Sequence, residues 1–299
     1  MKRAVLLYNT QAGRGKIGRN IDKIVAVFRD AGYDMRPKII EFGANPLDGS
    51  EDVDLAVVAG GDGTLNYIIN AMKRKGLSLT LGVIPAGTAN DFAGALGMSR
   101  NILRAARQIA RGTIEQIDCG VVEQIGRGRE KDIYFVNIFS FGIFTTTSQH
   151  TPEGLKHRIG RLAYLVAGLK DLKNLHSIPL TIATDEETFE YQPLMGLVFN
   201  GETAGRVPLA RNASLRDGVF DCLFLRKRNP LLSACDMLLY VLGINTGAVR
   251  SLRTGTLTLT TPVSEDTDVD GQRGGKFPMR VKCLHGDLNV ICPSDRAAE

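Results

Sequence analysis

The stretch that decides the fold is Leu55-Ala-Val-Val-Ala59, followed by Gly60-Gly61-Asp62-Gly63-Thr64 and an amphipathic segment over 65–75. A short run of small and apolar residues that ends in glycines is typical of a buried strand in a parallel sheet. Glycines after such a strand let backbone amides approach a phosphate group, and a following helix adds the positive end of its dipole. The stretch therefore predicts a strand, a phosphate-binding loop and a helix.

The same alternation of apolar strand, polar loop and helix is repeated on both sides of this stretch. Such alternation indicates βαβ units and a parallel sheet, in which the ligand lies outside the carboxyl ends of the strands. The expected elements are strands at 4–8, 35–42, 55–59 and 80–85, and helices at 19–31, 65–75 and 92–96.

Beyond about residue 120 the pattern changes to short segments in which apolar and polar residues alternate, which is typical of antiparallel β structure. The expected strands lie at 133–140, 178–184, 194–200, 219–225, 257–261 and 277–283, with helices at 154–173 and 230–242. We predict an α/β nucleotide-binding domain over 1–122, which the C-terminal tail at 289–299 rejoins. A second, antiparallel β-sandwich domain is expected over 123–288.

Composition indicates an ordinary globular protein, since 43% of the 299 residues are hydrophobic and 23% are charged. The net charge of +5, without a block of like charges, favours anionic small molecules or an anionic membrane surface over nucleic acid. Five scattered cysteines without a CxxC pair, and an N-terminal apolar run too short for a signal peptide, predict a reduced cytoplasmic protein. No run reaches the ~18–20 apolar residues of a membrane span, so membrane contact is expected to be peripheral, at the inner face.

The first glycine-rich run, Gly13-Arg-Gly-Lys-Ile-Gly18, matches the GxGxxG pattern of dinucleotide-binding proteins. Glu41 lies near the end of the second predicted strand, where a ribose-binding acid would lie. From this motif alone a plain turn, a nicotinamide-cofactor site and another kind of phosphate-binding loop all stay open. Lys16 is not the lysine of a P-loop, because Ile17 stands where that motif requires Ser or Thr.

Two carboxylates among the glycine loops indicate a divalent cation. Asp62 would repel a phosphate group unless a cation lay between them, and Asp91 follows the next predicted strand at the same sheet edge. Thr88 adds a hydroxyl group that can bind phosphate. The alternative is an Asp-Gly turn with a helix cap, but three loops that gather at one edge favour a nucleotide bound with Mg²⁺.

Gly60–Thr64 and the segment PAGTANDFA at 85–93 resemble the catalytic domain of bacterial soluble lipid kinases, in the diacylglycerol kinase and sphingosine kinase superfamily. NAD kinases and phosphofructokinases share the GGDG-type loop, but the NDFA-bearing loop is similar to the lipid kinases only. The resemblance extends over nearly the whole chain, although Thr10 stands where the family's first loop usually has proline. It implies a phosphotransferase of phospholipid biosynthesis that passes the γ-phosphoryl group of ATP to the hydroxyl group of a lipid such as diacylglycerol.

The resemblance also implies roles for the polar residues of the site. The residues that would hold the catalytic Mg²⁺ through water are Asp62, Asp91 and Asp118. The ligands of a second, structural Mg²⁺ would be the carboxylate of Asp217 and the backbone carbonyls of Ser214 and Val219. The expected ATP-binding residues are Asn9, Gly13, Gly15, Gly60, Gly61, Gly63, Thr64, Asn66, Thr88 and Asp91.

The chain departs from the family at Asp270-Gly271-Gln272, where the family has a glutamate proposed as the general base. Glutamine cannot accept the proton, and a general base contributes about 10²- to 10⁴-fold to the rate. Slower catalysis, Asp62 as the base, recruitment of Asp268 or Asp270, and an impaired site all stay open. So do two other functions, a kinase for a soluble acceptor such as NAD and a catalytically weakened protein that binds nucleotide or lipid.

A basic amphipathic helix is expected at 154–173, where Lys156, Arg158 and Arg161 interleave with apolar residues. Such a helix can lie on an anionic bilayer, but the commoner alternative is a surface helix packed on its own sheet. The same two interpretations apply to Arg226-Lys227-Arg228 beside the apolar helix at 230–242. The expected partner is a lipid substrate at a membrane surface and not a nucleic acid, while a homodimer stays open beside a monomer.

Overall fold

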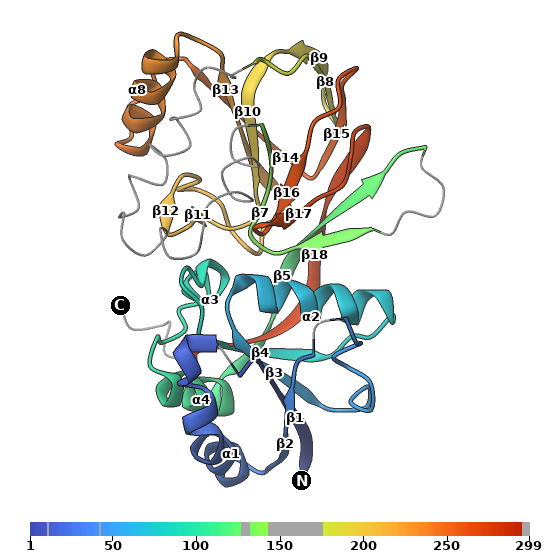
Figure 1. Ribbon diagram of the computed structural model, residues 1–299, viewed down its shortest axis with the longest axis vertical. Helices are drawn as coiled ribbons and strands as arrows, with labels where there is room; N and C mark the ends of the chain where they lie inside the picture. Colours follow the sequence, from blue (N-terminus) through green and yellow to red (C-terminus); the bar gives the residue numbers. More distant parts are fainter. Residues whose placement is uncertain (11, 42, 127–131, 143–175, 295–299) are drawn as a thin grey trace. The chain divides into compact units, whose positions relative to one another are not determined.

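The computed structural model describes residues 1–10, 12–41, 43–126, 132–142 and 176–294, which form two compact units (Figure 1). The first unit comprises Met1–Asp118 together with the chain from Gly286 onward, and the second comprises Cys119–His285. Both boundaries fall within long strands, β5 (Thr113–Gln124) and β18 (Met279–Cys292), a few residues before the predicted limits at 122 and 288. The helix predicted at 154–173 lies outside the described residues.

The first unit is built on a parallel sheet with the strand order β2-β1-β3-β4-β18. Its first four strands are β1 (Lys2–Tyr8), β2 (Tyr33–Ile39), β3 (Leu55–Gly60) and β4 (Thr80–Pro85). All residues of β3 are buried, as expected for a strand that is covered on both faces. The strand order changes direction at β1, so the carboxyl ends of β1 and β3 flank the place where such sheets bind ligands.

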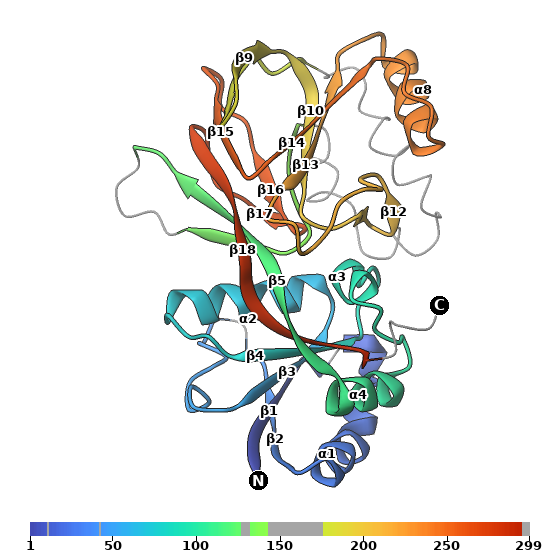
Figure 2. The same cartoon turned by 180° about the vertical axis from the view of Figure 1, so that it is seen from behind.

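Helices cover both faces of this sheet. The helices are α1 (Ile21–Asp30), α2 (Asp62–Arg74), α3 (Asp91–Ala95) and α4 (Ile102–Arg111). α1 and α4 pack against each other, on the opposite side of the sheet from α2 (Figures 1 and 2). α4 was not among the predicted elements because the residues it buries are mostly alanines, Ala105 and Ala106 beside Ile109, which give a weak apolar period.

The second unit is a β-sandwich, which confirms the predicted fold class. One sheet has the antiparallel order β14-β13-β10-β7-β16-β17. The other sheet contains β18, β15, β8 and β9, with β5 and β6. β11 and β12 form a small separate hairpin. The bounds of the strands are β6 (Ile133–Phe135), β7 (Ile138–Gly142), β8 (Leu180–Thr184), β9 (Thr188–Tyr191), β10 (Pro193–Phe199), β11 (Thr203–Ala204), β12 (Val207–Pro208), β13 (Phe220–Arg226), β14 (Val249–Thr254), β15 (Thr256–Thr260), β16 (Thr267–Val269) and β17 (Gln272–Arg273).

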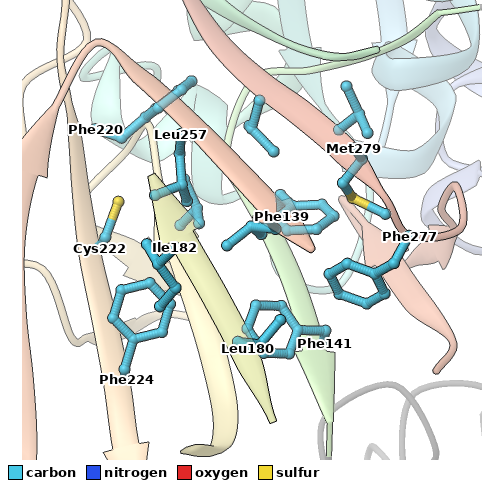
Figure 3. Packing of buried hydrophobic residues seen from close by; sticks show 14 of the residues in the cluster. Phe139, Phe141, Leu180, Ile182, Phe220, Cys222, Phe224, Leu257, Phe277 and Met279 are labelled. Carbon is cyan, nitrogen blue, oxygen red and sulfur yellow. The ribbon is translucent and has the colours of Figure 1, made fainter. Parts of the chain in front are cut away.

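The core of the second unit lies between its two sheets and is rich in phenylalanine (Figure 3). Phe139 and Phe141 on β7 are fully buried, and the ring of Phe141 lies 5.6 Å from that of Phe277 in an edge-on arrangement. A second apolar cluster covers the other face of the six-stranded sheet, under α8 (Pro230–Val241). The sandwich is therefore packed on both sides of that sheet.

The prediction of a single strand at 133–140 was wrong, because the structure divides this segment into β6 and β7. β6 pairs with β5 in one sheet, whereas β7 pairs with β10 in the other. All five cysteines are free thiols. In the described part of the chain, no helix is long and apolar enough to cross a membrane.

Candidate functional site

The loops after β3 and β4 meet at two glycines. A Cβ atom added to Gly87 would lie 2.4 Å from the Cα atom of Gly61, and one added to Gly61 would lie 3.0 Å from the Cα atom of Gly87. The amide of Ala86 also donates a hydrogen bond to the carbonyl of Gly60 at 2.8 Å. Both glycines are therefore required for the two loops to approach this closely.

The turn from β3 into α2 depends on a third glycine. A Cβ atom on Gly60 would lie 2.6 Å from the Cβ atom of Thr64, so no other residue fits there without displacing the first turn of the helix. Gly61 occupies the N-cap position, and α2 begins directly at Asp62. The N-terminal end of α2 therefore lies at this sheet edge, where its dipole favours an anion.

The first loop lies beside the third. The position of a Cβ atom on Gly13 is 3.5 Å from the carbonyl oxygen of Ala86, and the backbone of Gly13 has a positive φ of +61°. Two short 3₁₀ helices, at Ala12–Gly15 and Gly18–Asn20, separate β1 from α1. A dinucleotide fingerprint requires the α-helix to begin at the glycine loop itself. The run at 13–18 therefore resembles that fingerprint in sequence but not in structure.

Asp62 and Asp91 lie close enough for their charges to interact. Burial raises the pKa of Asp62, and the charge of Asp91 raises it further, while backbone amides of Phe92, Asp91 and Asn90 act in the opposite direction. The amide of Phe92 donates to Oδ1 of Asp62 at 3.2 Å. Two partly buried carboxylates that repel each other form a place where a hard divalent cation is stabilised. The donor set therefore fits Mg²⁺.

Asp118, the third predicted carboxylate, is fully buried in β5. Its Oδ1 accepts a hydrogen bond from the amide of Gly286 at 2.8 Å. Within the ranges that the structure describes, no three His, Cys, Asp or Glu side chains are placed to hold a metal ion together. A role for Asp118 through bound water stays a prediction.

The remaining predicted ATP ligands differ in exposure. Thr88 is exposed on the third loop and Asn9 is half-buried after β1. Asn66 is 4% exposed, and its side-chain oxygen accepts a hydrogen bond from Nδ2 of Asn70 at 3.1 Å. Asn66 therefore lies among the packed side chains of α2 rather than on a loop.

Sequence reasoning missed Asn90 as the residue that shapes the third loop. Its backbone is left-handed, with a φ of +55°, and its Oδ1 accepts a hydrogen bond from the amide of Gly87 at 2.7 Å. Its Nδ2 donates to the carbonyl of Gly87 at 2.8 Å. Asparagine tolerates this conformation better than most residues, so its place after Gly-Thr-Ala was the available signal.

The loop predicted to hold a structural Mg²⁺ already contains a cation. The carboxylate of Asp217 pairs with Arg253, whose Nε lies 3.4 Å from Oδ2 of Asp221. Burial raises the pKa of Asp221, Arg253 lowers it, and Asp217 raises it. One guanidinium group meets two carboxylates, so a net negative charge remains beside Asp217, and a structural Mg²⁺ held by Asp217, Ser214 and Val219 stays a prediction.

The Asp270-Gly271 pair forms a two-residue hairpin turn between β16 and β17. Both residues have a positive φ, +50° and +83°, as the favoured hairpin turns require. The carboxylate of Asp270 accepts hydrogen bonds of 2.9–3.0 Å from the amides of residues 136–138. These hydrogen bonds fix the point at which the chain passes from β6 to β7, and a role of Asp270 as the base stays an untested alternative. Gln272 is exposed at the start of β17.

Replacing Asp270 with alanine should destabilise the second unit. The change leaves two buried amides and one partly buried amide without their acceptor, and each unsatisfied buried group costs about 1–3 kcal/mol. We expect the free energy of unfolding, measured in urea, to fall by about 3 kcal/mol or more. Asp266→Ala is the matched control, because its ion pair with Arg273 is exposed. Similar losses in both variants would show that the Asp270 carboxylate does not hold the turn.

Comparison with known proteins identifies the family. The family model for the diacylglycerol kinase catalytic domain matches residues 3–122, and the model for the YegS C-terminal NAD kinase beta sandwich-like domain matches residues 137–292. A diacylglycerol kinase of Bacillus subtilis (strain 168) is 30% identical over 308 residues, which cover 100% of this chain and 99% of that protein. A diacylglycerol kinase of Staphylococcus aureus (strain bovine RF122) is 30% identical over 304 residues, which cover 98% of this chain and 93% of that protein.

A solved structure has the same fold over its whole length. A diacylglycerol kinase from Bacillus anthracis str. Sterne matches with a TM-score of 0.79 at 23% identity, and the match covers 98% of each chain. The two family models together span both units, and the full-length relatives share the order of the units. These matches, together with the loops that the glycine motifs form, show that the chain belongs to the diacylglycerol kinase family.

Proposed function

We propose that this chain is a lipid kinase that transfers the γ-phosphoryl group of ATP to a hydroxyl group of a lipid such as diacylglycerol. The observation that carries the proposal is the meeting of Gly61 and Gly87 beside the Asp62–Asp91 pair, at the sheet edge where α2 begins. The full-length likeness to proteins named diacylglycerol kinases supports the lipid as acceptor.

The glycine loops would bind the phosphates of ATP. Backbone amides around Gly61 and the N-terminal end of α2 supply positive dipoles, and the exposed hydroxyl group of Thr88 can donate a further hydrogen bond. Asp62 and Asp91 would hold Mg²⁺, which when bound neutralises charge on the phosphates. Catalysis of phosphoryl transfer rests mainly on such positioning and charge balance, so this unit carries most of what the reaction needs.

The acceptor hydroxyl group must also lose a proton. Gln272 cannot take it, and both oxygens of Asp270 accept hydrogen bonds from backbone amides. Asp62 is a half-buried carboxylate beside Asp91, at the loops that would bind the phosphates, so it can accept the proton of a hydroxyl group that meets the γ-phosphate. Asp62 is therefore the base that this chain offers, beside its role in holding Mg²⁺.

An assay of ATP turnover against several acceptors tests the proposal. The panel contains diacylglycerol, phosphatidylglycerol and a sphingoid base in mixed micelles, and NAD as a soluble acceptor. We expect a phosphorylated lipid and unmodified NAD. NAD is included because the second unit matches a β-sandwich described as NAD kinase-like. Phosphorylation of NAD alone, or ATP binding without any turnover, would overturn the proposal.

Gln272→Glu should raise the rate of lipid phosphorylation at least tenfold. The two side chains are nearly isosteric, position 272 is exposed, and the new carboxylate can accept the hydroxyl proton. A tenfold gain requires about 1.4 kcal/mol of transition-state stabilisation. The affinity for ATP should stay the same. Gln116→Glu makes the same chemical change on an exposed part of β5 and should leave the rate unchanged. A Gln272→Glu rate no higher than that of Gln116→Glu would show that a carboxylate at position 272 does not act as a general base.

A further inference from the structure

Helix α8 is apolar on two opposite faces. Its inner face packs on the six-stranded sheet through Met237, with Tyr240 and Val241 partly buried beside it. Its outer face carries Leu232 and Leu238, and Leu242 continues this face directly after the helix; they are 45%, 44% and 64% exposed. Met237, Tyr240 and Val241 recur at helical spacing on the inner face, as Leu238 and Leu242 do on the outer face, so the exposure follows from the helix itself. Figures 1 and 2 show α8 at the outside of the second unit, next to β13.

The charge of α8 lies on its inner face. Asp236, the single charged residue of the helix, is 4% exposed and pairs with Arg228 at 3.1 Å. It also accepts a hydrogen bond from the hydroxyl group of Thr246 at 2.6 Å. The outer face therefore has no charge of its own, and the exposed Ile244 extends it beyond the end of the helix. A soluble surface helix normally presents polar residues on this side.

Cations flank both ends of this face. Arg226 and Lys227 are exposed just before the helix, and neither side chain forms an ion pair with any carboxylate that the structure describes. Arg211 is exposed at the other end, where its guanidinium group donates a hydrogen bond to the carbonyl of Val241. An apolar strip with cations at its ends is complementary to a bilayer with an apolar interior and anionic headgroups.

We propose that the outer face of α8 docks on an anionic lipid bilayer. Leu232, Leu238 and Leu242 enter the boundary between headgroups and acyl chains, while Arg226 and Lys227 lie over the anionic headgroups. The proposal rests on the proposed function, because a lipid kinase must reach a hydroxyl group at a membrane. A second copy of the chain is a poorer occupant, since a symmetric contact between two α8 faces would bring their flanking cations together.

A fluorescent label on Cys235 gives a direct test. Cys235 is exposed and lies on α8, whereas Cys119, Cys222 and Cys292 are buried. An environment-sensitive dye at Cys235 should brighten and shift to the blue when vesicles of phosphatidylcholine with phosphatidylglycerol are added, and quenchers in the acyl chains should dim it. Salt should weaken the change. The matched control carries the dye at Ile114→Cys in a Cys235→Ser background, because Ile114 is exposed in the first unit. No change at Cys235, or equal changes at both sites, would overturn the proposal.

Two double variants test the apolar and the cationic parts separately. Leu238→Glu with Leu242→Glu should weaken vesicle binding about tenfold or more, whereas Ile114→Glu with Val263→Glu, at exposed apolar residues elsewhere, should not. Arg226→Glu with Lys227→Glu should weaken binding most at low salt. Its control, Arg107→Glu with Arg111→Glu on α4, makes the same change of charge at exposed residues. Equally large losses of vesicle binding in the control variants would mean that binding depends on net charge or on exposed apolar residues in general, and not on α8.

Activity on a soluble substrate separates this proposal from the proposed function. Leu238→Glu with Leu242→Glu should phosphorylate a short-chain diacylglycerol, below its micelle concentration, as fast as the wild type. If the wild type phosphorylates no lipid, the proposed function fails, while the vesicle and dye measurements still decide whether α8 docks. If instead the double variant converts a dimer to a monomer and keeps its vesicle binding, the outer face is a contact between copies and the membrane proposal is wrong.

Discussion

Gly87→Ala should abolish the binding of ATP while leaving the two units folded. The added Cβ atom would lie 2.4 Å from the Cα atom of Gly61 and 2.9 Å from Oδ1 of Asn90, so the second and third loops must separate. The amide of Gly87 would also lose its hydrogen bond to Asn90. Since phosphate groups are bound by backbone amides at fixed positions, we expect at least a hundredfold loss of affinity, about 2.8 kcal/mol. Gly61→Val should behave in the same way, with its Cβ atom 3.0 Å from Gly87.

The measurement is the melting temperature with and without Mg²⁺ and ATP, because a ligand that binds the folded state raises it. Gly94→Ala is the matched control, since its Cβ atom would meet nothing within 4 Å. Gly94 lies in α3, where alanine stabilises a helix by about 0.5–1 kcal/mol over glycine. We expect Gly94→Ala to keep the full ATP-induced shift. A full shift in Gly87→Ala as well would mean that ATP binds elsewhere.

The first unit could be predicted from sequence because its decisive features are local. The β3 strand, its glycine loop and α2 follow one another within twenty residues, and each has its own pattern of apolar residues or glycines. The bounds of β4 agree with the prediction at 80–85. That the loops meet follows from strand order, since parallel strands end at the same edge.

The second unit was harder to predict because its decisive contacts join residues far apart in the chain. Nothing in the sequence near residues 136–138 shows that their amides will donate hydrogen bonds to the carboxylate of Asp270. These bonds divide the expected strand into β6 and β7. In the same way, nothing in the sequence near Asp217 shows that it will pair with Arg253. Local patterns report burial and turns well, but they carry no information on which distant polar group will meet which.

Strand β18 shows a related limit. The apolar pattern predicts a strand at 277–283, whereas the structure has one strand over Met279–Cys292. The polar residues in its middle interrupt the alternation, although the backbone continues to pair, first with β15 and then with β4. Alternation detects a strand only where one face is buried throughout, and β18 leaves one unit and enters the other along its length.

Asp62→Asn should lower phosphoryl transfer by about 10²- to 10⁴-fold, with a much smaller change in ATP affinity. The amide keeps the oxygen that accepts the hydrogen bond from Phe92, so the shape of the loop is retained. It removes the negative charge that would hold Mg²⁺ and the basicity that would accept the hydroxyl proton. Asp185→Asn, at an exposed turn between β8 and β9, should leave both quantities unchanged. Equal losses of affinity and turnover in Asp62→Asn would limit Asp62 to ATP binding.

The same variant should be more stable than the wild type at neutral pH when Mg²⁺ is absent. Burial, and then the charge of Asp91, raise the pKa of Asp62 in the folded protein. A carboxyl group with a raised folded pKa contributes stability that is present below its unfolded pKa and is lost as the pH rises through the folded value. At pH 7 the wild type therefore has an unfavourable charge that Asp62→Asn removes.

The melting temperature of Asp62→Asn should thus exceed that of the wild type by a few degrees at pH 7, and the difference should shrink as the pH falls toward about 4, the ordinary value of an aspartate. At pH 7, added Mg²⁺ should also reduce this difference in melting temperature, because it stabilises the charged carboxylate of the wild type. Asp185→Asn should show neither effect. A lower melting temperature for Asp62→Asn at pH 7 without Mg²⁺ would mean that the carboxylate stabilises the fold. The charge of Asp62 would then not be unfavourable in the folded protein without Mg²⁺, as this prediction requires.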